Sequence, residues 1–246
     1  MGEVFRISGI SIYTLGLVVV VSYLFGAFVY YKKAIEAHIE EVIVLDTIVI
    51  CAFWAIMLGR VSFVFLNFSQ FFKHLSRIFL LVDYPGVERW GVFLGIFLGL
   101  YLVLRKKKMK LIDFLDLITL GFFVSSSFFW IGLNFINFYW QNLVLGFYYF
   151  LIFGFLWKLE RTYRLISWYR AGKAFAKSGF VLGFGLAALG VGFGLEKLLF
   201  VSMFWQNMLV SIGFLFSGLA LVYIRSGRIL VDDIKVINIW KKKIKK

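Results

Sequence analysis

Seven apolar runs, each near the length that crosses a bilayer, dominate this 246-residue sequence. A transmembrane helix needs about 20 consecutive, predominantly apolar residues. The runs lie at about 10–31, 42–63, 90–104, 111–131, 138–157, 179–195 and 199–224. The apolar content of 62% agrees with this pattern, because soluble domains have roughly 45–50%. The chain is therefore predicted to be an all-α polytopic membrane protein with seven transmembrane helices.

The third and fourth runs are joined by a dense cationic turn. The run 90–104 is shorter than a usual span, so the helix is predicted either to begin earlier, at Val87, or to extend forward by snorkelling of Arg105 and Lys106. The turn also holds Lys107, Lys108 and Lys110. Because cations in short loops remain on the side where insertion begins, this turn is predicted to be cytoplasmic.

The distribution of charge over the other loops gives the same orientation. Of the lysines and arginines, 21 lie in the alternate segments 32–33, 105–110, 158–177 and 225–246, whereas five lie on the opposite side. The N-terminus is therefore predicted outside and the C-terminus in the cytoplasm, which requires an odd number of spans. The net charge of +14 does not indicate a nucleic-acid partner, because the cations lie between apolar runs rather than on a soluble face.

Two loops and the tail are predicted to lie in the membrane interface. The outer loop 68–84 has apolar residues at helical spacing and polar residues mostly on the other face, which predicts an amphipathic helix. The cytoplasmic loop 158–177 and the tail 235–246 mix cations with aromatic residues and are interpreted as basic anchors. Solvated loops without a specific ligand are an equally good interpretation of both. All are assigned to one transmembrane domain, 1–246.

Polar groups at membrane depth are the default candidates for a site. Asp113 and Asp116 begin the fourth run, where helix capping and neutralisation of the lysines is a better interpretation than a catalytic pair. Amides near the outer side, including Asn134 and Asn137, are expected to bond between helices, with a polar cavity as the alternative. Cys51 is the only cysteine, so neither a disulfide, a metal site nor a cofactor is expected.

Residue types alone indicate no catalytic site. The motifs HExxH, GxSxG and GxxxxGK[ST] are absent, and neither histidine lies in an apolar run. The glycines spaced through 179–194 predict a sixth span that packs closely against a neighbouring helix.

Several stretches, in chain order, resemble the prolipoprotein diacylglyceryl transferase family. They are 11–17 (SIYTLGL), 57–64 (MLGRVSFV), the aromatic outer loop, the glycine-containing hairpin with its lysine turn and FLDL, 130–137 (WIGLNFIN) and 178–190. The seven-span topology with an outer N-terminus is also that of the family. The resemblance implies a multi-pass protein of the bacterial cytoplasmic (inner) membrane. It also implies transfer of a diacylglyceryl group from phosphatidylglycerol to the lipobox cysteine of a prelipoprotein.

The resemblance also shows that reactive positions of the family are substituted. Its essential tyrosine falls on Leu15, its histidine on Trp90 and its signature arginine on Trp130. Attack by a thiol on the glycerol carbon needs a base for the proton and cations for the departing phosphate, and tryptophan supplies neither. No catalytic residue is identified. The remaining candidates for lipid binding are Arg60, Arg89, Asn134, Asn137 and Glu196.

Three functions are left open by these residues. The first is a phospholipid-binding relative with weakened or lost transfer activity. The second is an active, divergent transferase in lipoprotein biogenesis. The third is a non-enzymatic subunit of a membrane complex, suggested by the 31 phenylalanines. The expected partners are a phosphatidylglycerol-like phospholipid and the signal peptide of a prelipoprotein.

Overall fold

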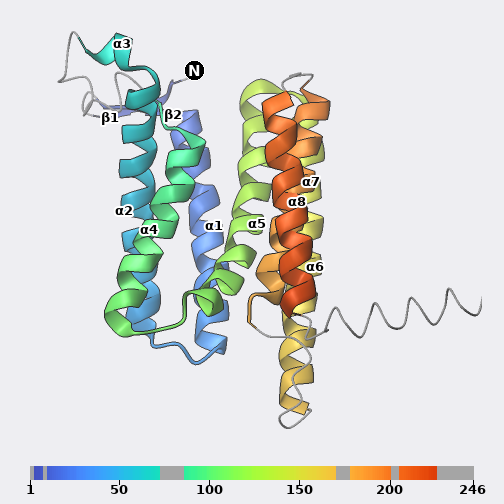
Figure 1. Ribbon diagram of the computed structural model, residues 1–246. Coiled ribbons are helices and arrows are strands. Elements are labelled where there is room, and N and C mark those ends of the chain that lie inside the picture. Colours follow the sequence, from blue (N-terminus) through green and yellow to red (C-terminus); the bar gives the residue numbers. More distant parts are fainter. Residues whose placement is uncertain (1–2, 8–9, 73–85, 170–177, 201–204, 226–246) are drawn as a thin grey trace, which may run out of the picture. The chain divides into compact units, whose positions relative to one another are not determined.

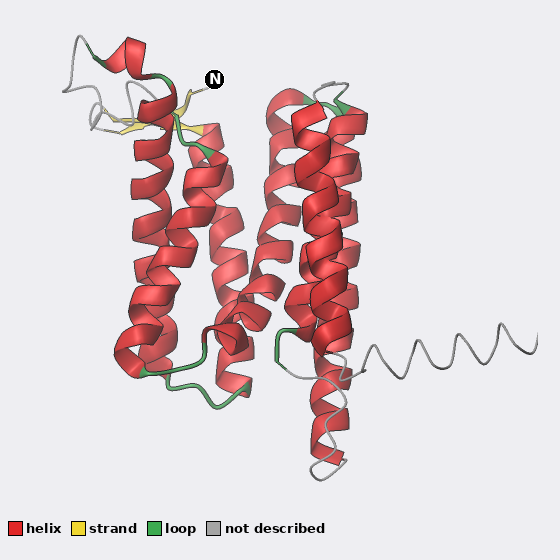
Figure 2. Cartoon of the chain, viewed as in Figure 1, coloured by secondary structure: helices red, strands yellow, loops and turns green. Residues whose placement is uncertain are grey.

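The computed structural model describes residues 3–7, 10–72, 86–169, 178–200 and 205–225. The elements, in chain order (Figure 1), are β1 (Glu3–Ile7), β2 (Ile10–Tyr13), α1 (Thr14–Glu36), α2 (Glu41–Leu66), α3 (Phe68–Phe71), α4 (Arg89–Lys107), α5 (Leu111–Asn137), α6 (Trp140–Tyr169), α7 (Phe180–Leu199) and α8 (Trp205–Arg225). Helices account for nearly all of the described chain (Figure 2). The predicted all-α polytopic class is confirmed.

The start of the first predicted span is wrong. Residues 10–13 were expected in that span, but they form β2, which pairs antiparallel with β1 and brings Ile7 opposite Ile10. Ser8 and Gly9 separate two short runs rich in β-branched and aromatic residues, a pattern that favours a hairpin over a helix. Helix α1 therefore begins at Thr14 and continues to Glu36.

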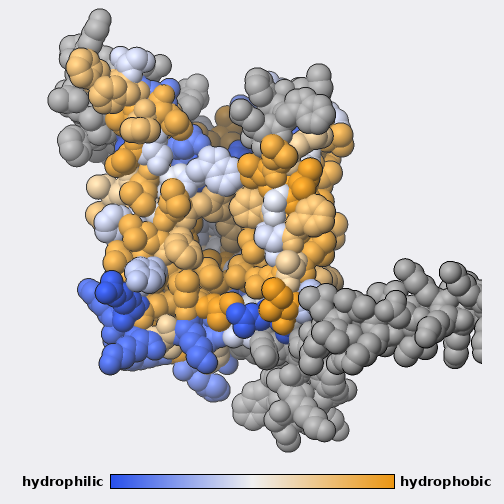
Figure 3. All heavy atoms as spheres, in the orientation of Figure 1, coloured by the Kyte–Doolittle hydropathy of each residue, from blue (hydrophilic) through white to orange (hydrophobic). Residues whose placement is uncertain are grey.

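Six helices of the described chain are long and apolar enough to cross a membrane. The remaining long helix, α4, has 19 residues, or about 28 Å, with cations at both of its ends. Many large apolar side chains are exposed, such as Phe65 at 77% and Leu151 at 70%. Hydrophobic side chains cover much of the face seen in Figure 3. A soluble protein seldom exposes so much apolar surface, so these side chains are suited to contact with lipid.

The cationic turn is reached by forward extension of α4. The helix runs from Arg89 through Lys107 and ends with Lys108 in the left-handed region, at φ 53°. The Lys108 N–H donates to the Arg105 carbonyl at 3.4 Å, and the Met109 N–H donates to the Leu104 carbonyl at 3.2 Å. These two bonds form a Schellman C-cap. The snorkelling alternative therefore describes α4 better than an earlier start at Val87.

The chain forms two compact units, described separately here. Unit 1 comprises Met1–Thr14 and Tyr30–Phe114, and unit 2 comprises Leu15–Val29 and Leu115–Lys246. In unit 1, α2 and α4 pack side by side (Figure 1). Gly91, Gly95 and Gly99, one turn apart on α4, lie against the backbone of α2, and a Cβ at Gly99 would lie 2.9 Å from the Cα of Cys51. Side chains would separate these helices, so the glycines permit the close contact.

Unit 2 is built around a core of aromatic and aliphatic side chains. Val29, Leu120, Phe123, Val124, Tyr149, Leu156 and Val181 are its buried members. Polar bonds also cross between the helices: Ser127 Oγ donates to the Gly146 carbonyl at 2.9 Å, and Tyr148 Oη donates to the Ala188 carbonyl at 2.6 Å. Gly183 and Gly190 of α7 contact the backbone of α8, which confirms the close packing predicted for the sixth span.

The predicted interfacial segments are only partly described. Of the outer segment 68–84, the structure describes α3 and Phe72, and residues 73–84 lie outside the described residues. Helix α6 continues through Tyr169, so the first part of the segment 158–177, predicted to be cytoplasmic, is continuous with a membrane helix, while 170–177 lie outside the described residues. The tail 235–246 also lies outside. The anchoring roles and the single-domain organisation stay predictions.

Candidate functional site

Arg60 is held near one end of α2 by backbone and aromatic partners. Its side chain is 5% exposed, and its Nη1 donates to the Gly86 carbonyl at 3.1 Å. The guanidinium carbon lies 5.3 Å from the centroid of the Phe71 ring and 5.7 Å from that of Phe63. A buried guanidinium needs hydrogen-bond acceptors, and aromatic faces stabilise its charge further. These partners fix the position of the cation.

The segment that leads into α4 is tied to the same end of α2. The Glu88 N–H donates to the Gly59 carbonyl at 2.9 Å, directly beside Arg60. Arg89 and Trp90 then begin α4, and both are exposed, Trp90 by 42%. Unit 1 thus presents a buried cation, Arg60, and an exposed one, Arg89, at the same end.

The other three predicted site residues belong to unit 2. Asn134 is half-buried and Asn137 is exposed in the last turn of α5, while Glu196 is half-buried in the last turn of α7. The Trp130 ring on α5 stacks on Phe200, which follows α7, at 6.1 Å between centroids and 25° between planes. This stacking brings the ends of α5 and α7 together. The two amides and the carboxylate therefore lie at one end of unit 2.

Trp90 and Trp130 both make aromatic contacts. Trp130 is half-buried, packs against the core of unit 2 and contacts Phe129 as well as Phe200. The Trp90 ring lies 5.9 Å from that of Phe93. An indole has one neutral N–H donor and no basic nitrogen at physiological pH. These side chains can shape an apolar surface, but they cannot accept a thiol proton.

Potential metal ligands are scattered over the described part of the chain. No cluster of three potential metal ligands among His, Cys, Asp and Glu occurs within the described residues. His38 caps the end of α1, in the left-handed region at φ 58°. His74 lies outside the described residues.

Asp116 caps a helix, as the sequence predicts. The helix that it caps is α7, however, and not α5, to which Asp116 belongs. The Gly179 N–H donates to Asp116 Oδ2 at 2.6 Å, and the Leu182 N–H donates to Oδ1 at 2.7 Å. Gly179 occupies the N-cap of α7 and has no side chain to perform this function. Asp113 is exposed, so the two carboxylates have different environments.

Comparison with known proteins agrees with the resemblance carried by the motifs. The family model of prolipoprotein diacylglyceryl transferase matches residues 3–140, which is more than half of the chain. The matched range contains Arg60, Arg89, Asn134 and Asn137, and ends before Glu196. No curated protein matches the sequence significantly. The chain, a multi-pass membrane protein by its apolar helices, therefore belongs to the prolipoprotein diacylglyceryl transferase family.

Proposed function

We propose that this protein binds phospholipid through the family's lipid site but has weakened or lost diacylglyceryl transfer activity. The observation that carries the proposal is the pair of aromatic contacts at Trp90 and Trp130, where the family places a reactive histidine and an arginine. Removing one preorganised hydrogen-bond donor that stabilises charge in the transition state typically lowers the rate about a hundredfold to a thousandfold. Two such substitutions are expected to reduce transfer severely.

Binding requires less than catalysis, and the groups for it are present. In unit 1, Arg60, supported by Arg89, would hold a phosphate. The candidate residues of unit 2 for polar contacts with a lipid headgroup are Asn134, Asn137 and Glu196. Such groups give affinity without accelerating a reaction, because they stabilise the bound ground state as much as the transition state. The predicted location is the bacterial inner membrane, with a phosphatidylglycerol-like lipid and a prelipoprotein signal peptide as partners.

Transfer activity is tested with the full chain in vesicles that contain phosphatidylglycerol and a lipobox peptide. Mass spectrometry would detect the diacylglyceryl group on the cysteine. We expect no measurable product for the natural chain, and a gain of product after the paired substitutions Trp90→His and Trp130→Arg. Efficient transfer by the natural chain would overturn the proposed loss of activity and establish a divergent transferase.

Lipid binding is tested separately by native mass spectrometry of the purified chain. Arg89→Gln, at an exposed position, should reduce retention of phosphatidylglycerol by about fivefold, since one cation near the surface contributes about 1 kcal/mol. Arg105→Gln, at the opposite end of α4, is the matched control and should retain the lipid. A protein that carries no phospholipid would favour the third function, a non-enzymatic subunit.

A further inference from the structure

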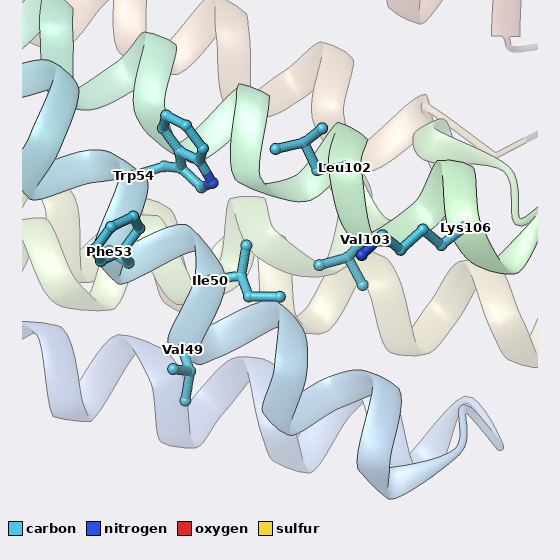
Figure 4. A pocket seen from close by; sticks show the side chains of 7 residues that line it. All are labelled: Val49, Ile50, Phe53, Trp54, Leu102, Val103 and Lys106. Atoms are coloured by element: carbon cyan, nitrogen blue, oxygen red, sulfur yellow. The ribbon is translucent and has the colours of Figure 1, made fainter.

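An apolar groove lies between α2 and α4, away from Arg60. Val49, Phe53 and Trp54 of α2 line one side, while Leu102 and Lys106 of α4 lie on the other (Figure 4). Its volume is about 440 Å³, within the range of roughly 300–1,000 Å³ that is typical of small-molecule pockets. All but one of its lining residues are apolar. The groove is thus suited to a hydrocarbon chain.

Lys106 is the single charged residue of the lining. Its side chain points back along the groove toward Val103 (Figure 4), although it lies next to the last residue of α4. Within the part of the chain that the structure describes, no carboxylate forms an ion pair with it. Arg105 and Lys107 flank it, and hydrophilic side chains gather at this end of the unit (Figure 3). The groove therefore combines an apolar floor with a cation at one end.

The depth of the groove matches one leaflet. Trp54 lies about 20 Å along α2 from Glu41, and Leu102 lies about 8 Å from the end of α4, at 1.5 Å per residue. The hydrocarbon core of a bilayer is about 30 Å thick. The groove thus extends from the cationic turn to about the middle of the bilayer. A phospholipid matches this arrangement, because its anionic phosphate would lie at the cationic end and its acyl chain along the apolar residues.

We propose that this groove binds an anionic phospholipid from the leaflet of the cationic turn, which is predicted to be cytoplasmic. The acyl chain lies against Phe53, Trp54 and Leu102, and the phosphate pairs with the Lys106 ammonium. A zwitterionic lipid fills the same groove with less affinity, because its headgroup has no net negative charge. This site is separate from the proposed site at Arg60, which lies nearer the other end of α2, so either can fail without the other.

The test uses native mass spectrometry of the full chain with phosphatidylserine and phosphatidylcholine that carry identical acyl chains. The natural chain should retain phosphatidylserine in preference to phosphatidylcholine. Lys106→Gln should reduce retention of phosphatidylserine about fivefold. Lys107→Gln is the matched control, because it removes the same charge from the same turn but does not line the groove. Equal losses in the two variants would overturn the proposal in favour of general attraction to the turn.

Two further variants test whether the groove itself holds the lipid. Leu102→Trp fills the groove and should abolish the preference for phosphatidylserine, whereas Leu94→Trp, at an exposed position on the same helix, should leave it unchanged. In vesicles, brominated phosphatidylserine should quench the fluorescence of the natural chain more than brominated phosphatidylcholine, and Trp54→Phe should remove this difference. Retention unaffected by Leu102→Trp, or quenching unaffected by Trp54→Phe, would overturn the proposed position.

Discussion

The two units hold their helices together by different means. In unit 1, α2 and α4 meet through the glycines of α4, and their backbones come into contact. In unit 2, side chains mediate more of the contacts: an aromatic core surrounds Phe123, and hydroxyl groups bond to carbonyls of neighbouring helices. Lipid supplies no hydrophobic force between helices, so association depends on close packing and on interhelical hydrogen bonds. Unit 1 depends mainly on the first and unit 2 on both.

This difference extends to the functional groups. In unit 1, Arg60 is held by the Gly86 carbonyl and by the rings of Phe63 and Phe71. In unit 2, Trp130 joins the aromatic packing by stacking on Phe200.

The largest effect is expected from Gly95→Ala in unit 1. A Cβ at this position would lie 2.6 Å from the Cα of Ala55, so the backbones of α2 and α4 would have to separate. We expect a loss of about 3 kcal/mol in the free energy of unfolding, measured by equilibrium unfolding in mixed micelles. Gly154→Ala is the control, because no atom lies within 4 Å of its Cβ; it should be neutral or stabilising. If Gly95→Ala and Gly154→Ala changed the free energy of unfolding equally, the stability of unit 1 would not depend on contact between the backbones of α2 and α4.

A smaller loss is expected from Asp116→Ala in unit 2. The substitution leaves the N–H groups of Gly179 and Leu182 without their carboxylate acceptor, which should reduce the free energy of unfolding by about 2 kcal/mol. Asp113→Ala, three residues earlier and exposed, should change it by less than about 0.5 kcal/mol. Hydrogen exchange at the start of α7 would localise the effect. Unchanged exchange there would mean that the cap is dispensable.

The interhelical hydroxyl bonds of unit 2 are tested by Tyr148→Phe. This variant removes only the oxygen that donates to the Ala188 carbonyl, and single bonds of this kind contribute about 0.6 kcal/mol on average in membrane proteins. We expect a loss of about 1 kcal/mol, since the bond is short and partly buried. Tyr101→Phe, at a position 43% exposed on α4, serves as the comparison and should have no effect. If Tyr148→Phe left the free energy of unfolding unchanged, the stability of unit 2 would be attributed to packing alone.

The smallest effect is a gain in stability at the end of α4. Lys108 adopts a left-handed conformation, which costs a residue with a side chain about 1 kcal/mol. Lys108→Gly relieves this strain but loses some chain entropy, so a net gain of about 0.5 kcal/mol is expected. Lys107→Gly, one residue earlier in a helical conformation, should instead destabilise by a similar amount. Thermal unfolding of both variants would show whether their effects have opposite signs, and a shared sign would contradict the assigned cap.

The prediction of membrane spans succeeded because hydropathy is a property of consecutive residues. Helix ends were harder: the charges after Leu104 suggested an end, yet α4 continues to Lys107, since long cationic side chains can extend beyond the apolar region. The hairpin before Thr14 was missed because its apolar residues were counted with those of the adjacent span. The spacing of Gly91, Gly95 and Gly99 was a visible signal for the contact between α2 and α4.

The sequence by itself determined the membrane class, the apolar runs, the predicted orientation and, through its motifs, the family, because each depends on residue type and order. Only the tertiary structure decided which helix Asp116 caps, which rings enclose Arg60 and where a groove opens beside Lys106. Asp116 and Gly179 are 63 residues apart, so their contact depends on how α5 and α7 pack and rotate. That packing is set jointly by many side chains, and no local pattern encodes it.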